Sequence, residues 1–278
     1  MHFPVSGVAC PLWLPPAAAF LVALLTAPAG LSGAFLLLPF QMSVLGFVSP
    51  AVTPTNLIYN VVATPGGIVR YIQERRMEWR LALAILAGTL PGVALGAVVR
   101  IRYLPDPRYA KLFVGCVLLY LGVRLLFHSL RAAAGKRPET TSFNPALLAA
   151  VALPVGVIGG IYGVGGGAII APFAMTILRL PARMVAGAAM VGTLVTSIMG
   201  VATFEMLSRM PLSAGASVQP DWMLGLLFGV GGLAGSYFGA RLQKHLPERW
   251  IRLVLGLIIT ALALTYVIRF LLTSRVML

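Results

Sequence analysis

"GGIYGVGGGAIIAPF", residues 159–173, contains six glycines within fifteen residues. Inside a helix, each glycine is destabilising by about 1 kcal/mol relative to alanine. The stretch therefore predicts that one helix ends here and another begins. What such a break means depends on its surroundings, because backbone without helical hydrogen bonds is tolerated in a membrane only where protein or a water-filled cavity surrounds it.

The chain around this stretch is strongly apolar. Of its 278 residues, 59% are hydrophobic and 10% are charged, and the mean hydropathy is +0.94. Charge-free runs cover 1–69, 81–99, 140–178, 184–204, 222–240 and 253–268. About 20 apolar residues cross a bilayer as a helix. We therefore expect an all-α, multi-pass integral membrane protein embedded in the lipid bilayer.

The charged and metal-binding residues exclude several functions. The net charge of +14 comes from Lys and Arg in short groups between apolar runs, which is typical of contacts with lipid headgroups and not of nucleic-acid binding. Two cysteines and three histidines without ligand spacing predict no metal site and no cofactor. Seven acidic residues and the lack of a hydrolase or metalloprotease motif predict that the protein is not an enzyme.

The chain also contains an internal repeat. "GLSGAFLLLPF" (30–40) and "GVGGGAIIAPF" (163–173) share the pattern Gly-x-[Ser/Gly]-Gly-x5-Pro-Phe. We predict a first membrane repeat at 1–130, a polar linker at 131–145 and a second membrane repeat at 146–278. Each half should hold about four helical segments, of which the first is a Gly-broken or re-entrant helix.

Three further helices are expected in each half. In the first half they cover about 52–69, 80–99 and 108–130, and in the second about 184–203, 223–241 and 250–271. The middle helix of each set has Gly-x3-Gly-x3-Gly spacing, which places three glycines on one face. Small residues on one face let a neighbouring helix approach closely in lipid, so we assign this motif to packing.

The distribution of positive charge favours an inverted repeat. If the Gly-broken segment enters and returns as a hairpin, Lys and Arg divide 14 against 7 between the two sides of the membrane. Four plain crossings per half would divide them 10 against 11. Because cytoplasmic loops carry an excess of Lys and Arg, the uneven division predicts an inverted second half with both termini outside.

The breaks suggest an anion site. Secondary transporters with inverted repeats bind their substrates near the midplane, where helices are interrupted. Backbone N–H groups at a helix start can hold an anion without a charged side chain. Gly33 and Ala34 in the first half, and Gly165, Gly166 and Gly167 in the second, are the candidate binding residues. The alternative is that these glycines serve only tight helix packing.

Polar residues follow the first break in "VTPTNLIYN" (52–60). Thr53 can cap a helix that has Pro54 at its first position, with Thr55 nearby. Asn56 and Asn60 lie four residues apart on one face, which favours a polar cavity. An ordinary cap with no ligand contact is the alternative. We include Thr53, Thr55, Asn56 and Asn60 among the candidate substrate-binding residues.

The duplicated Gly-rich segments, "GGIYGVGGGAIIAP" above all, and the Gly-x3-Gly helix make the chain resemble the TauE/SafE family of sulfite exporters, also called the TSUP family. This resemblance covers nearly the whole chain. It implies a transporter of small sulfur-containing anions, such as sulfite or organosulfonates, in a bacterial or archaeal inner membrane. Self-association into a homo-oligomer stays open. The first copy departs from the Gly-rich pattern at Ser32, Ala34 and Phe35, so the two copies are not expected to bind equivalently.

Other readings remain at this point. Transport of another small anion such as a carboxylate is the nearest alternative, and an embedded enzyme or a membrane scaffold is more distant. Cation carriers usually place carboxylates within the membrane. Glu205 is the one such candidate, and Arg209 follows it by four residues, so we expect a surface ion pair there.

Overall fold

The computed structural model describes residues 1–29, 31–104, 106–131, 142–176, 178, 180–210, 218–242 and 248–275. The described residues form helices apart from their connections and one isolated β-bridge between His2 and Ala9. In chain order the helices are α1 (Leu14–Thr26), η1 (Ala27–Ala29), α2 (Ala34–Ser43), α3 (Val52–Gln73), α4 (Trp79–Arg102), α5 (Pro107–Arg131), α6 (Pro145–Tyr162), α7 (Gly166–Thr176), α8 (Ala182–Ser208), α9 (Trp222–Leu242) and α10 (Glu248–Arg275).

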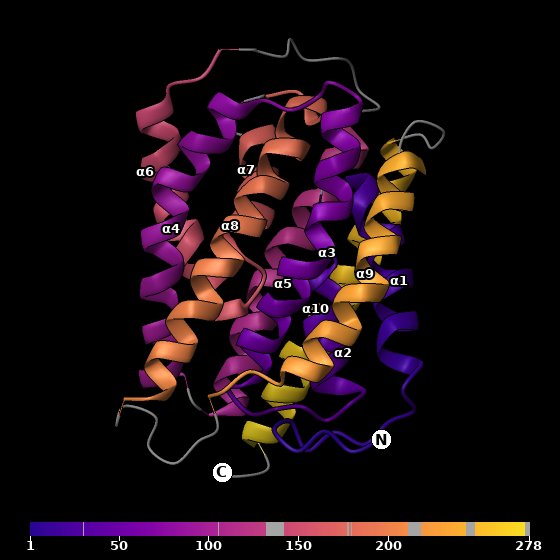
Figure 1. Cartoon of the computed structure of the whole chain (residues 1–278), viewed down its shortest axis with the longest axis vertical. Helices are drawn as coiled ribbons and strands as arrows, with labels where there is room; N and C mark the ends of the chain where they lie inside the picture. Colours follow the sequence, from indigo (N-terminus) through magenta and orange to yellow (C-terminus); the bar gives the residue numbers. More distant parts are fainter. Residues whose placement is uncertain are drawn as a thin grey trace.

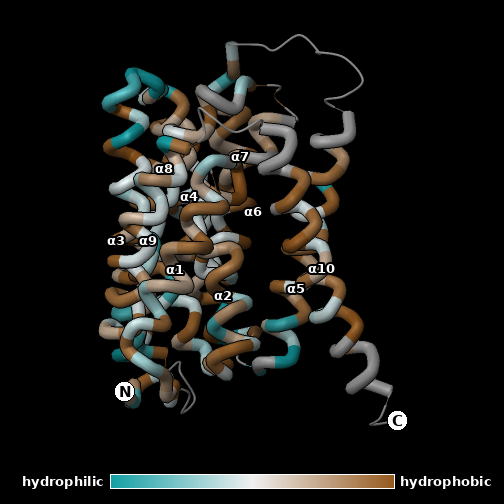
Figure 2. The backbone as a smooth tube through the Cα atoms, turned by 90° about the vertical axis from the view of Figure 1, so that its right-hand side faces the viewer, coloured by the Kyte–Doolittle hydropathy of each residue, from teal (hydrophilic) through white to brown (hydrophobic). Residues whose placement is uncertain are grey.

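The helices stand side by side in one upright bundle (Figure 1). Among the long helices, α3 packs against α8 and α9, and α4 packs against α8. Helix α6 packs on α4, and α1 packs on α9. Helices α5 and α10 pair with each other and lie at one edge (Figure 2). The short helices α2 and α7 lie inside the bundle, where α2 contacts α3 and α7 contacts α8.

Four of the described helices are long and apolar enough to cross a membrane: Trp79–Arg102, Pro145–Tyr162, Met184–Ser208 and Trp222–Leu242. Hydrophilic positions gather mainly at the two ends of the bundle, whereas hydrophobic ones dominate between them (Figure 2). Large apolar side chains such as Leu83 and Leu95 are more than half exposed on the outside of α4. A hydrophobic exterior of this kind suits lipid as the surrounding solvent.

The Gly-x3-Gly-x3-Gly helices pack as predicted. On α4 the glycines lie against backbone carbonyls of α6: Gly88 at Ala149, Gly92 at Leu153 and Gly96 at Val157. On α9 they lie against carbonyls of α1: Gly231 at Pro16, Gly235 at Phe20 and Gly239 at Leu24. A Cβ at any of these positions would overlap the neighbouring backbone, so the glycines allow two pairs of helices to approach closely.

Candidate functional site

Three residues separate α6 from α7 inside the bundle. Gly163 (φ +78°) ends α6, Gly165 has φ +74°, and α7 starts at Gly166. These two backbone conformations strongly favour glycine. The Gly166 N–H donates to the Thr196 hydroxyl of α8 over 3.1 Å. The candidate glycines therefore lie at a turn between two helices, and the amide of one of them has a protein partner.

The glycines of this turn are also tightly packed. A Cβ on Gly167 would overlap the Ala189 carbonyl, and one on Gly166 would meet the Thr89 side chain of α4. A Cβ on Gly165 would lie 3.0 Å from the Ser197 hydroxyl oxygen. Replacing any of these glycines therefore disturbs packing or backbone conformation, whether or not an anion binds there.

The first half has a similar turn, which leads from η1 into α2. The Ala34 N–H donates to the Ser32 hydroxyl oxygen over 3.2 Å, and the Ser32 hydroxyl donates to Oδ1 of Asn60. Gly33 lies directly against the Tyr59 hydroxyl, with no room for a side chain between them. The predicted residues Gly33, Ala34 and Asn60 are thus brought together.

Asn56 connects the two turns. Its Nδ2 donates to the Ala34 carbonyl over 3.2 Å and to the Gly163 carbonyl over 2.8 Å, while its Oδ1 accepts from Gln41 Nε2 over 3.1 Å. The side chain is fully buried. Because it satisfies carbonyls from both halves of the chain, Asn56 joins the start of α2 to the end of α6.

Besides Oε1 of Gln41, which can only accept a hydrogen bond, three buried polar groups beside these turns have no hydrogen-bond partner among the described residues. They are the Tyr59 hydroxyl and Asn60 Nδ2 on α3 and the Ser197 hydroxyl on α8. All three side chains have an exposed fraction of 0%. A buried polar group without a partner is destabilising by about 1–3 kcal/mol and is rare in folded proteins, so it calls for an explanation.

Two predicted residues have other roles. α3 begins at Val52 after Ala51, which makes no side-chain capping bond, so the prediction that Thr53 caps this helix is wrong. The preceding turn supplies the start instead, since the Val52 N–H donates to the Ser49 carbonyl. Thr55 lies away from the central turns, where its hydroxyl donates to the Ala51 carbonyl and accepts the Asp221 N–H at 2.9 Å.

The predicted ion pair is confirmed, with 3.3 Å between Arg209 Nη2 and Glu205 Oε1. The Arg209 side chain is 77% exposed. The contribution of such an exposed pair to stability is small, about 0–1 kcal/mol.

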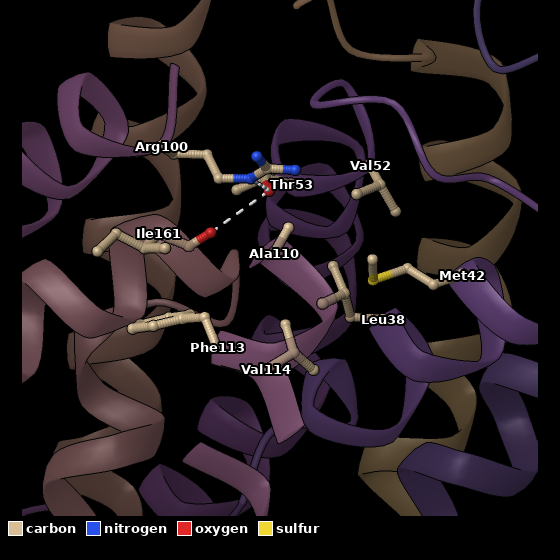
Figure 3. Close-up of a pocket in the computed structure, with 9 residues that line it drawn as sticks. All are labelled: Leu38, Met42, Val52, Thr53, Arg100, Ala110, Phe113, Val114 and Ile161. Carbon is tan, nitrogen blue, oxygen red and sulfur yellow. Dashed lines mark hydrogen bonds between the residues drawn. The ribbon is translucent and has the colours of Figure 1, made fainter. Parts of the chain in front are cut away.

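Thr53 belongs to a narrow pocket among α2, α3, α4, α5 and α6, together with Arg100 and Ile161 (Figure 3). The Thr53 hydroxyl points to the Ile161 carbonyl at 3.4 Å, and Arg100 Nε donates to Thr53 Oγ1 at 3.3 Å. The free interior is about 10 Å³, close to what a single water molecule needs.

Sequence reasoning did not single out the buried polar side chains Tyr59, Ser197 and Arg100. Arg100 directly follows the charge-free run 81–99, a position that is typical of a charge flanking the membrane. The sequence does not indicate whether the side chain of an arginine at a helix end points into the bundle or out to solvent. Tyr59 adjoins Asn60 within the polar stretch that the sequence did single out, whereas Ser197 carries no local signal.

Comparisons with known proteins agree with the resemblance found in the sequence. The family model "Sulfite exporter TauE/SafE" matches residues 16–266. A "Probable membrane transporter protein" of Xylella fastidiosa (strain 9a5c) is 28% identical over 247 residues, covering 86% of this chain and 88% of the relative. "Probable membrane transporter protein YunE" of Bacillus subtilis (strain 168) is 21% identical over 250 residues, covering 83% and 88%. No solved structure matches the chain.

Proposed function

The chain belongs to the sulfite exporter TauE/SafE family of membrane transporters, and on this basis we propose that it carries a small sulfur-containing anion by alternating access around the two central turns. Sulfite or an organosulfonate is the proposed substrate. The membrane is proposed to be a bacterial or archaeal inner membrane. The proposed binding residues comprise those predicted from the sequence at the turns, joined by Tyr59 and Ser197.

The observation that carries this proposal is the set of unpartnered donors. The Tyr59 hydroxyl, the Asn60 amide and the Ser197 hydroxyl are buried where the chain turns at the starts of α2 and α7. All three groups can donate a hydrogen bond, and an anion accepts several. Binding of an anion would give these groups the partners that they lack. The two helix starts add favourable dipoles, so neither a cationic side chain nor a metal ion is required at the turns themselves.

The proposal includes an inverted repeat, in which residues 1–130 and 146–278 form the two halves. Most of the predicted linker between them, residues 132–141, lies outside the described part of the chain. The helix contacts support the inverted repeat, because the most extensive contacts of α4 and α9 across the halves occur in reciprocal pairs. α4 packs on α6 as α9 packs on α1, and α4 packs on α8 as α9 packs on α3. Such reciprocal packing is expected for halves related by a two-fold axis.

The direction of the chain supports the same arrangement. The N-terminus and the final part of α10 lie at one end of the bundle, and the connection from α3 to α4 lies at the other (Figure 1). That connection includes Arg75 and Arg76, with Arg70 and Arg80 beside it. The excess of positive charge there favours a cytoplasmic location for this end.

The test is transport by the purified protein in proteoliposomes. We expect uptake of ³⁵S-labelled sulfite above that of protein-free vesicles, and competition by methanesulfonate or taurine. Acetate and pyruvate serve as carboxylate competitors. Inhibition by carboxylates with no effect of sulfonates would overturn the substrate class, and no flux of any of these anions would overturn the proposed function.

A further inference from the structure

Arg100 is a buried cation inside the bundle. It lies in the last turn of α4, yet its exposed fraction is only 2%. Its neighbour Arg102 is exposed on the same helix turn, where its guanidinium lies over the Tyr103 ring. Two arginines at one helix end therefore have opposite environments, because a step of two residues turns a helix by about 200°.

The charge of Arg100 is not neutralised within the described part of the chain. Ion pairs are found there for Arg70, Arg76 and Arg209, and none of them involves Arg100. Arg100 Nε donates to the Thr53 hydroxyl oxygen, and Nη1 donates to the Leu104 carbonyl. No described residue accepts a hydrogen bond from Nη2. Buried charges in proteins are normally paired, and an ionisable residue within a membrane helix commonly marks a substrate path.

The pocket beside Arg100 lies close to the central turns. Thr53 lies one helical turn before Asn56, and its backbone carbonyl would be 2.7 Å from a Cβ on Gly163. Ile161, whose carbonyl faces the Thr53 hydroxyl, is two residues before Gly163. Figure 3 shows the Arg100 guanidinium directly above Thr53, at the head of this pocket, with apolar side chains such as Leu38 and Phe113 below.

We propose that Arg100 and Thr53 form an anion-binding subsite, which receives the –SO₃ group of the substrate between the end of the bundle and the central turns. This subsite rests on the proposed function. Arg100 supplies a full positive charge beside the pocket, and Thr53 supplies a hydroxyl donor once it releases the Ile161 carbonyl. The narrow interior of the pocket indicates that α2 or α5 moves aside when the anion enters.

The first experiment compares Arg100→Gln with Arg102→Gln in ³⁵S-sulfite uptake by proteoliposomes. Both variants remove one arginine from the end of α4, so the net charge changes equally. We expect Arg100→Gln to raise KM about tenfold or more, as for a lost charge-assisted hydrogen bond, and Arg102→Gln to leave KM within about twofold. Arg100→Lys keeps the charge and should retain part of the affinity.

Chemical rescue distinguishes charge from structure. In a background with Cys10→Ala and Cys116→Ser, Arg100→Cys is treated with 2-aminoethyl methanethiosulfonate, which attaches an ammonium group, or with neutral methyl methanethiosulfonate. We expect the first reagent to recover sulfite uptake and the second to leave it low. Equal recovery with both reagents would show that Arg100 only fills space.

The outcomes separate the two proposals. If wild-type protein transports sulfite or methanesulfonate but Arg100→Gln and Arg102→Gln have the same KM, the subsite is wrong and the proposed function stands. If wild-type protein moves neither anion, the proposed function itself fails. Comparing sulfite with methanesulfonate shows whether the subsite recognises the –SO₃ group alone: both KM values should then rise by a similar factor in Arg100→Gln.

Discussion

Tyr59→Phe removes one oxygen atom that the structure leaves without a partner, so its effects on stability and on binding should have opposite signs. The Tyr59 hydroxyl is fully buried and unpartnered. Removing such a group relieves a penalty of about 1–3 kcal/mol in the protein without substrate. We therefore expect the melting temperature of substrate-free Tyr59→Phe to equal or exceed that of the wild type by a few degrees.

Binding should weaken in the same variant. A hydrogen bond to a charged group contributes about 1.5–3 kcal/mol, which corresponds to an increase in Kd of roughly 10- to 150-fold. Ser197→Ala, which removes the unpartnered hydroxyl beside Gly165, should behave alike. The assays are equilibrium binding of ³⁵S-sulfite to purified protein and thermal unfolding followed by tryptophan fluorescence, each performed on monodisperse samples.

Tyr162→Phe is the matched control. Its hydroxyl is equally buried but donates to the Phe35 carbonyl over 2.8 Å. Losing this bond should lower stability by about 1 kcal/mol and change Kd by less than threefold. The reasoning is refuted if Tyr59→Phe and Ser197→Ala both bind sulfite as the wild type does. It is also refuted if their melting temperatures fall as far as that of Tyr162→Phe, since that would reveal a structural partner for these hydroxyls.

Three other substitutions test neighbouring parts of the structure. Asn56→Ala removes the amide that donates to both the Ala34 and the Gly163 carbonyl, so we expect the free energy of unfolding to fall by about 2–4 kcal/mol and uptake to decrease. A stable variant with normal uptake would contradict the connecting role of Asn56. Thr55→Val leaves the Asp221 N–H without its acceptor and should lower thermal stability by about 1–2 kcal/mol with Kd unchanged, whereas a weaker Kd would place Thr55 in the site. Glu205→Gln breaks only an exposed ion pair, so uptake should stay near the wild-type rate, and abolished uptake at normal protein level would indicate coupling through this carboxylate.

Much of the helical architecture follows from local sequence. The helices predicted at about 80–99 and 223–241 are observed at Trp79–Arg102 and Trp222–Leu242, because apolar runs in lipid must satisfy their backbone hydrogen bonds within the segment. The glycine spacing on these helices predicted close packing, since small residues three apart on one face have the same effect in any membrane bundle. Gly163 and Gly165 marked the turn, because their positive φ angles are accessible mainly to glycine.

The composition of the central site depends on tertiary structure. The preceding turn decides whether the helix starts at Val52 or after Thr53. The folded positions of residues 34 and 163 decide whether the Asn56 side chain faces a ligand or two backbone carbonyls. Ser197 meets Gly165 only because α8 packs on α7, and Arg100 turns inward while Arg102 turns outward only because α4 packs against α6 and α8. Sequence alone determined the terms that act within one segment: hydropathy, helix interruption and small-residue faces. The contacts between segments far apart in the chain arise from packing of whole helices, and these contacts decided which polar groups are left buried and unpaired at the centre of the protein.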